Sequence, residues 1–204
     1  AMSKIRFAAS VASALGIAGG AGLAFSSNPL AGEWKERIGT AAYKNVAWPI
    51  LRNIDPEKSH ELTIWASKYR LTPVDRVPDD PILHTEVFGL KFSNPLGLAA
   101  GCDKQAEAVE SFLAMGFGAV EVGSITPLPQ PGNEKPRLFR LEQDQGVINR
   151  YGFNSDGSDA VSARLKALRS GAALAGSVGV NLGKNKTGDA ERDFTHGVGG
   201  PRPR

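Results

Sequence analysis

The stretch 94–104 constrains the fold of this chain more than any other part of the sequence. It contains an apolar run of strand length, 96–100, followed by Gly101 and a charged pair. Gly101 has no Cβ and would let a flat or anionic ligand approach the backbone. Over 105–116 the apolar residues recur at helical spacing. A buried strand, a turn of small residues and an amphipathic helix make half of a βαβ unit, so the sequence predicts an α/β fold with parallel strands.

Two further segments, 119–123 and 178–182, have the length and composition of buried strands. Each of the three predicted strands has a polar residue at or just beyond its C-terminal end, namely Lys104, Ser124 and Asn181. The carboxyl ends of parallel strands lie on one side, where (β/α)₈ barrels hold their ligands. Ser124 alone also fits a simpler interpretation, the cap of a helix or turn.

Between the second and third strands the chain makes a long excursion, 125–156. Its first part contains four prolines, which argue against a helix, and 137–141 alternates like a hairpin strand. The segment 149–154 is dense in hydrogen-bonding and aromatic groups. Loops longer than ~15 residues are uncommon unless functional. Either this loop closes over a small polar substrate, or it is a turn with Gly152 in a left-handed conformation.

Helices are predicted on both sides of this excursion. Asp55 and the proline after it are typical of an N-cap and a first helical turn. A later helix, marked by Val161, Leu165 and Leu168, would be capped by Ser158 or a neighbour, and another begins at Asp189. The segment 85–92, with a central glycine, predicts a small hairpin that leads into the first strand.

The N-terminal segment 7–25 has no charged residue and follows the basic residues Lys4 and Arg6. As a helix it would span ~28 Å, about the thickness of a bilayer core. It is a membrane anchor, a cleaved targeting peptide or a buried soluble helix. Two short amphipathic helices follow it, interrupted at Pro49. They either lie on a bilayer surface or pack on the domain.

Composition limits the chemistry that the chain can carry. The net charge of +3 is modest and the basic residues lie partly at the chain ends, so no nucleic-acid surface is predicted. The single cysteine, Cys102, excludes an internal disulfide and a cysteine-built zinc site. His60, His84 and His196 lack metal-ligand spacing, so no metal site is predicted.

Several motifs, in order, resemble those of class 2 dihydroorotate dehydrogenases. The first is Asn94-Pro95-Leu96-Gly97-Leu98-Ala99-Ala100-Gly101, followed by Asp103-Lys104. The others are the segments 119–127, 136–141, 149–154 and 179–187. The resemblance runs from about Trp48 to Phe194. Cys102 stands where the family usually has an aromatic residue.

The resemblance implies an FMN-containing (β/α)₈ barrel, a monomer on the mitochondrial inner membrane or on a bacterial membrane. It would oxidise dihydroorotate to orotate and pass the electrons through FMN to ubiquinone, in pyrimidine (UMP) biosynthesis. By motif position, the residues near FMN would be Ala100, Gly101, Cys102, Asp103, Lys104, Ser124 and Asn181. Those near dihydroorotate would be Lys104, Asn149, Arg150, Tyr151, Gly152 and Phe153. The quinone site would include His60 and Arg140.

On this basis the chain divides into four parts. They are a leader with a transmembrane anchor (1–28), a helical quinone-site domain at the membrane (29–72), the first part of the barrel (73–194) and a divergent tail (195–204). A whole barrel takes ~250 residues, so about three of its eight βα units are expected.

A partial barrel of this kind would lack the family's serine base, which lies after the fourth strand. No residue is therefore assigned as catalytic base, and we expect no turnover from this chain alone. Its apolar faces and last strand edge would stay exposed, which predicts aggregation or degradation. Two alternatives are a membrane-tethered binding module without chemistry and a different flavin barrel oxidoreductase.

Overall fold

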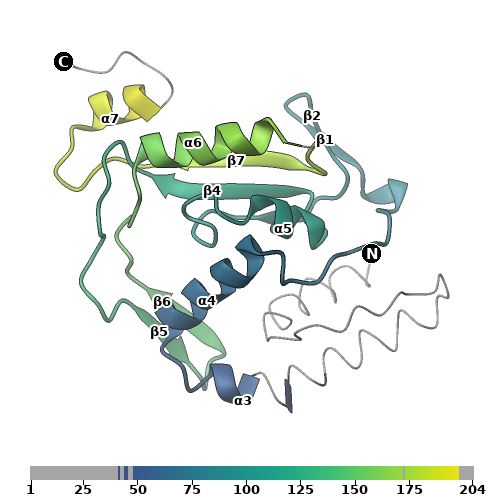
Figure 1. Ribbon diagram of the computed structural model, residues 1–204, viewed down its shortest axis with the longest axis horizontal. Helices are drawn as coiled ribbons and strands as arrows, with labels where there is room; N and C mark the ends of the chain where they lie inside the picture. Colours follow the sequence, from purple (N-terminus) through teal and green to yellow (C-terminus); the bar gives the residue numbers. More distant parts are fainter. Residues whose placement is uncertain (1–40, 42–43, 46–47, 172, 198–204) are drawn as a thin grey trace.

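A computed structural model of the chain describes residues 41, 44–45, 48–171 and 173–197 (Figure 1). The predicted leader and anchor, and most of the predicted tail, lie outside the described residues. Within the described ranges, no helix has the length and apolar character needed to cross a membrane.

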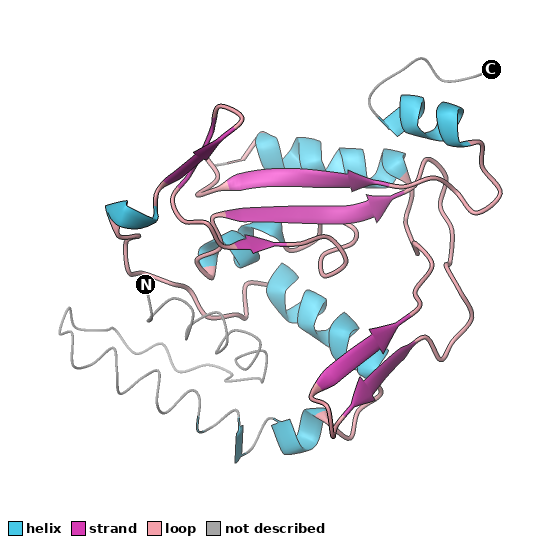
Figure 2. Cartoon of the chain, turned by 180° about the vertical axis from the view of Figure 1, so that it is seen from behind, coloured by secondary structure: helices cyan, strands magenta, loops and turns pink. Residues whose placement is uncertain are grey.

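Three parallel strands form the centre of the structure (Figure 2). Their order is β3 (Gly97–Leu98), β4 (Ala119–Ile125) and β7 (Ser177–Leu182). Val120 of β4 is in register with Leu98 on one side and with Val178 on the other. The predicted parallel arrangement is confirmed, although β3 is shorter than expected and β4 continues two residues past Gly123.

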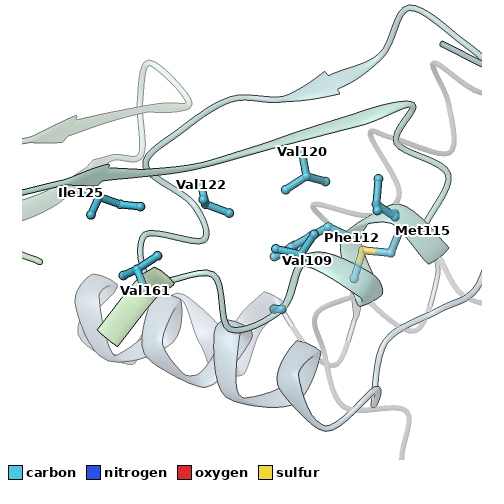
Figure 3. Packing of buried hydrophobic residues seen from close by; sticks show 9 residues of the cluster. Val109, Phe112, Met115, Val120, Val122, Ile125 and Val161 are labelled. Carbon is cyan, nitrogen blue, oxygen red and sulfur yellow. The ribbon is translucent and has the colours of Figure 1, made fainter. Parts of the chain in front are cut away.

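The core lies between this sheet and two helices, α5 (Val109–Ala114) and α6 (Ser158–Arg169). In Figure 3 the side chains of Val120, Val122 and Ile125 point from β4 towards these helices. Phe112 of α5, Met115 just after it and Val161 of α6 are among the buried residues that meet them. Burial of each such side chain contributes roughly 1.5–3 kcal/mol, which fixes the sheet against the helices.

The start of the first helix differs from the prediction, whereas the second is capped by a neighbour of Ser158, one of the two predicted positions. The pattern placed the start of the first helix near Gln105, but α5 begins at Val109 because the Asp103 carboxylate accepts hydrogen bonds from backbone N–H groups further along the chain. The cap of α6 is Gly157, which has a φ of 88° and no side-chain cap. Ser158 instead donates its hydroxyl to the carbonyl oxygen of Pro127.

Ahead of the sheet lie a short helix, α3 (Trp48–Leu51), and a longer one, α4 (Pro56–Lys68). Pro49 lies in the first turn of α3, where proline is tolerated. Asp55 caps α4 as predicted, since its carboxylate accepts from the N–H of Lys58 at 3.0 Å. The inner face of α4 packs on the domain through Ile64.

The outer face of α4 is different in character. Trp65 and Tyr69 are 52% and 59% exposed. One face of this helix therefore packs on the domain while aromatic side chains remain on its solvent side.

Two antiparallel hairpins complete the fold. The predicted hairpin is confirmed as β1 (Thr85–Val87) and β2 (Leu90–Phe92), preceded by a 3₁₀ turn at Pro81–Leu83. The second joins β5 (Leu138–Leu141) to β6 (Gly146–Asn149) and lies beside α4 (Figure 1). The last helix, α7 (Ala190–Gly197), ends at the glycine where the sequence pattern breaks.

Candidate functional site

The carboxyl ends of the three parallel strands border a cavity of about 480 Å³. The side chains and backbone that line it come from the strand ends, the segment 149–154 and α4. The lining residues are His60, Ala100, Gly101, Lys104, Gly123, Ser124, Leu138, Asn149, Tyr151, Gly152, Phe153, Asn154 and Asn181. Most of the residues that the sequence predicted for a cofactor and substrate are thus brought together.

The floor of this cavity is made of small residues. Gly101 has a φ of 105°, and a Cβ built there would meet no atom within 4 Å. Its N–H donates to the carbonyl oxygen of Gly123 at 2.9 Å, which fixes the turn after β3 against β4. A side chain at position 101 would therefore fill space that a flat ligand could occupy.

Ser124 and Asn181 place polar groups on neighbouring strands of this floor. The Ser124 hydroxyl donates to the side-chain carbonyl of Asn181. Ser124 lies within β4, so its interpretation as a helix or turn cap is wrong. The pair leaves the amide nitrogen of Asn181 as a donor on this side of the sheet.

Lys104 supplies a positive charge to the cavity. Its ammonium donates to the side-chain oxygen of Asn154 at 3.1 Å and lies 3.0 Å from the ring centroid of Tyr151. Within the described part of the chain, no carboxylate forms an ion pair with it. Burial, together with the charge of Arg137, lowers the pKa of Lys104 to about 8. The group is suited to binding a carboxylate ligand.

The loop 149–154 contains the left-handed turn that its sequence suggested, and its role in closing over a substrate stays a prediction. Gly152 has a φ of 71°, so it is a left-handed turn, and the loop also lines the cavity. Asn133 makes two hydrogen bonds to the backbone of this loop. Its N–H donates to the carbonyl oxygen of Tyr151, and its side-chain amide donates to the carbonyl oxygen of Arg150, both at 2.8 Å. These hydrogen bonds fix the position of the loop at the side of the cavity.

A profile of the dihydroorotate dehydrogenase family matches residues 82–199. The chain belongs to this family. It is 54% identical over 151 residues to the dihydroorotate dehydrogenase (quinone) of Azorhizobium caulinodans, a match that covers 74% of this chain and 42% of that protein. It is 48% identical over 159 residues to the enzyme of the same name from Rhodospirillum rubrum, over 78% of this chain and 42% of that one.

Solved structures agree with this assignment. The crystal structure of DHODH from Eimeria tenella in complex with ferulenol matches with a TM-score of 0.67 and 49% identity, over 71% of this chain and 40% of that chain. The three parallel strands and their helices are therefore part of a TIM barrel, as predicted. The chain spans about two fifths of the length of the relatives that it matches.

Some of the predicted site residues point elsewhere. The carboxylate of Asp103 is buried and accepts from the N–H groups of Glu107 and Ala108 at 2.9 and 2.8 Å, and burial raises its pKa. Cys102 lines a second cavity of about 280 Å³ beside α4, and burial raises the pKa of its thiol to about 11. Arg150 donates outward to the carbonyl of Pro136.

The two predicted quinone-site residues have different surroundings. His60 lines both cavities, and its Nε2 lies 2.8 Å from the carbonyl oxygen of Cys102; burial lowers its pKa. Arg140 lines neither cavity and donates to the carbonyl of Ile54 at 2.7 Å and to the hydroxyl of Ser59 at 2.9 Å. Arg140 thus ties β5 to the start of α4.

Asn154 lines the cavity and was not assigned by sequence reasoning, although it ends a motif that was recognised.

A cavity of about 500 Å³ between α6 and β7 is slightly larger, but it is lined mainly by apolar side chains on the helix side of the sheet, including Leu165, Val178 and Val180. We assign the site to the strand ends because a cation, amides and small residues converge there. Within the described ranges, no group of His, Cys, Asp and Glu is placed to hold a metal ion.

Proposed function

We propose that this chain forms the first part of the barrel of a quinone-dependent dihydroorotate dehydrogenase. The whole enzyme would oxidise dihydroorotate to orotate and pass the electrons to ubiquinone, in pyrimidine biosynthesis. The observation that carries this proposal is the convergence of Lys104, the loop 149–154 and the glycine floor on one cavity. The names of the relatives support the substrate and the quinone.

The residues at the strand ends fit FMN. A flavin ring is flat, and the open space over Gly101 would accept it without a clash. Ala100, Lys104, Ser124 and Asn181 surround that space and would supply hydrogen bonds and a positive charge. Cys102 and Asp103 would contribute only backbone, since their side chains face elsewhere. When bound, FMN supplies the hydride acceptor and the electron carrier.

Dihydroorotate carries a carboxylate and ring amides, and the cavity offers matching partners. Lys104 would hold the carboxylate, while Asn149 and Asn154 present side-chain amides on the same wall. Tyr151, Gly152 and Phe153 would enclose the ring, which fixes the reacting carbon in place. A proton must also leave that ring to a base. We assign no residue of this chain as that base.

The second cavity is the proposed path for the quinone. It lies between α4 and the turn after β3, and its apolar lining includes Ile64 and Trp65. His60 lines both cavities and would stand between quinone and flavin. We place the protein on a membrane through residues 1–28, and the relatives from Azorhizobium and Rhodospirillum favour a bacterial membrane over the mitochondrial one.

Orotate binding tests this proposal. Orotate titrated calorimetrically into the full chain with FMN should bind saturably. Replacing Lys104 by Met should abolish that binding, because the carboxylate would lose its cation. Lys91→Met, on the exposed strand β2, should bind like the unaltered chain. Absence of orotate binding to the unaltered chain, or equal binding by the Lys104 variant, would contradict the proposal.

A further inference from the structure

A buried ion pair joins α4 to the barrel segment just before β5. Glu57 and Arg137 are each 6% exposed, and the Arg137 Nη2 lies 2.7 Å from the Glu57 carboxylate. Burial would raise the pKa of Glu57, but hydrogen bonds from Arg137 and Lys135 outweigh it and lower the pKa. The pair is therefore ionised, and removal of the Glu57 charge would leave the buried Arg137 guanidinium without a carboxylate partner among the described residues, whereas Glu57 also has Lys135 at 3.2 Å.

The other terminal nitrogen of Arg137 donates to the segment 131–133, which contacts the loop 149–154. Its Nη1 donates to the carbonyl oxygens of Pro131 at 2.6 Å and Asn133 at 2.9 Å. Asn133 in turn donates through its N–H to the carbonyl of Tyr151. One guanidinium thus connects α4, the segment 131–133 and the loop.

Tyr151 lies between Arg137 and Lys104. The Arg137 guanidinium carbon is 4.9 Å from the Tyr151 ring centroid, and the Lys104 ammonium is 3.0 Å from the same centroid. The Tyr151 hydroxyl is buried and has no hydrogen-bond partner among the described residues. The position of the ring therefore depends on what packs against its faces and edges, rather than on its hydroxyl.

We propose that Glu57 and Arg137 are positioning residues that hold the Tyr151 ring against Lys104 and so direct the Lys104 ammonium at the substrate carboxylate. Lys104 has only Asn154 as a hydrogen-bond acceptor within the described ranges, so the aromatic face is its main support. The inference rests on the proposed function, since it takes Lys104 as the carboxylate-binding group. It extends the site to a helix residue that does not line the strand-end cavity.

The charged and titratable groups around Lys104 come from several elements. They are Glu57, His60, Glu61 and Lys68 of α4, Tyr69 at its end, Cys102 and Asp103 of the same turn, Glu107 before α5, Arg137 before β5 and Tyr151 after β6. Of these, Glu57 favours the charged ammonium and Arg137 disfavours it. Loss of the Glu57 charge should therefore lower the pKa of Lys104 as well as release Arg137.

The test compares Glu57→Gln and Arg137→Lys with Glu110→Gln in the full chain with FMN. Glu110 pairs with Arg70 at 2.8 Å, which also ties the end of α4 to the barrel but does not reach Tyr151. We expect the orotate dissociation constant to rise about tenfold in the first two variants and to stay unchanged in the third. The pH at which orotate binding is half lost should also move down in Glu57→Gln and stay in place in Glu110→Gln.

The outcomes separate the two proposals. If the unaltered chain does not bind orotate, the proposed function fails. If it binds, and Glu57→Gln and Arg137→Lys bind equally well with the same pH profile, the positioning role fails alone.

Should the variants not fold, proton NMR of the unaltered chain decides. The Tyr151 ring protons should titrate with Lys104 near its pKa of about 8, and the Arg137 Nε proton should exchange slowly with water. Ring protons without that titration would overturn the inference.

Discussion

At the scale of single residues, Lys104 supplies an ammonium group to the cavity. It combines a lowered pKa with contacts to an aromatic face and one amide. A lysine in that setting keeps its charge near neutral pH but loses it more easily than a solvated lysine. A carboxylate ligand would restore the preference for the charged form.

This predicts a pH dependence of orotate binding. The ammonium form is fully present below the pKa of Lys104, about 8, and is lost as the pH rises through it. Orotate affinity should be constant below pH 7 and fall about tenfold per pH unit above the pKa. Calorimetric titrations in the presence of FMN between pH 6.5 and about 9.5 measure this.

Lys104→Arg is the matched variant, because its guanidinium stays charged throughout that range. Its affinity should be lower at neutral pH, since the guanidinium has a different shape, but it should not fall as the pH rises. A flat profile for the unaltered chain would show that another group binds the carboxylate.

At the scale of secondary-structure elements, the turn that leads into α5 depends on the Asp103 carboxylate, which accepts from the N–H groups of Glu107 and Ala108. Asp103 is fully buried and accepts two backbone N–H groups, whereas Asp55, the cap of α4, is exposed and accepts one. Asp103→Ala should lower the free energy of unfolding by about 2 kcal/mol and Asp55→Ala by about 1 kcal/mol or less. Urea unfolding followed by circular dichroism would measure both. Equal losses of unfolding free energy in the two variants would mean that burial of the Asp103 carboxylate adds no stability.

The close approach of β4 to the start of β3 gives a second prediction at this scale. A Cβ on Gly118 would overlap the carbonyl oxygen of Asn94, whose side chain is held by hydrogen bonds to Asp79 and Gly116. Gly118→Ala should therefore destabilise the chain by about 1–3 kcal/mol.

Gly97, on β3, is the control for this substitution. A Cβ there would lie 3.9 Å from the nearest atom, the carbonyl oxygen of Ala119, which is an ordinary contact. Gly97→Ala should leave the thermal midpoint nearly unchanged. A midpoint for Gly118→Ala within a degree or so of the unaltered chain would contradict the steric argument.

The elements that sequence reasoning found are those whose signals are local. The apolar runs of β4 and β7, the hairpin β1–β2 and the cap at Asp55 each follow from a few adjacent residues. The start of α5 was misplaced because Asp103 holds the residues before the helix in an irregular turn. In such a turn side chains do not alternate, so the directions of Cys102 and Asp103 did not follow from spacing.

Long-range contacts account for the rest of what the sequence did not reveal. Glu57 and Arg137 are 80 positions apart, and no periodicity connects them. Asn154 enters the cavity only because its loop folds back over the turn after β3. Family resemblance supplied the roles of the strand ends, which composition and spacing alone left open.

At the scale of the whole molecule, the sheet has open edges in the described part of the chain. β7 is paired only with β4, and Val180 is 42% exposed. A preparation of these 204 residues should self-associate through this edge. Sedimentation velocity should show less association for Val180→Lys, while Val147→Lys, at an exposed site on β6, should associate like the unaltered chain. Equal association of all three would exclude the β7 edge.

The assignment of the flavin site to the strand ends is tested most directly by mapping FMN on the chain by NMR. Two cavities of similar size compete, one at the strand ends and one between α6 and β7. The account predicts that FMN shifts the backbone amide signals of Gly101, Ser124 and Asn181. Shifts confined to Leu165, Val178 and Val180 would place the ligand in the other cavity and contradict the account.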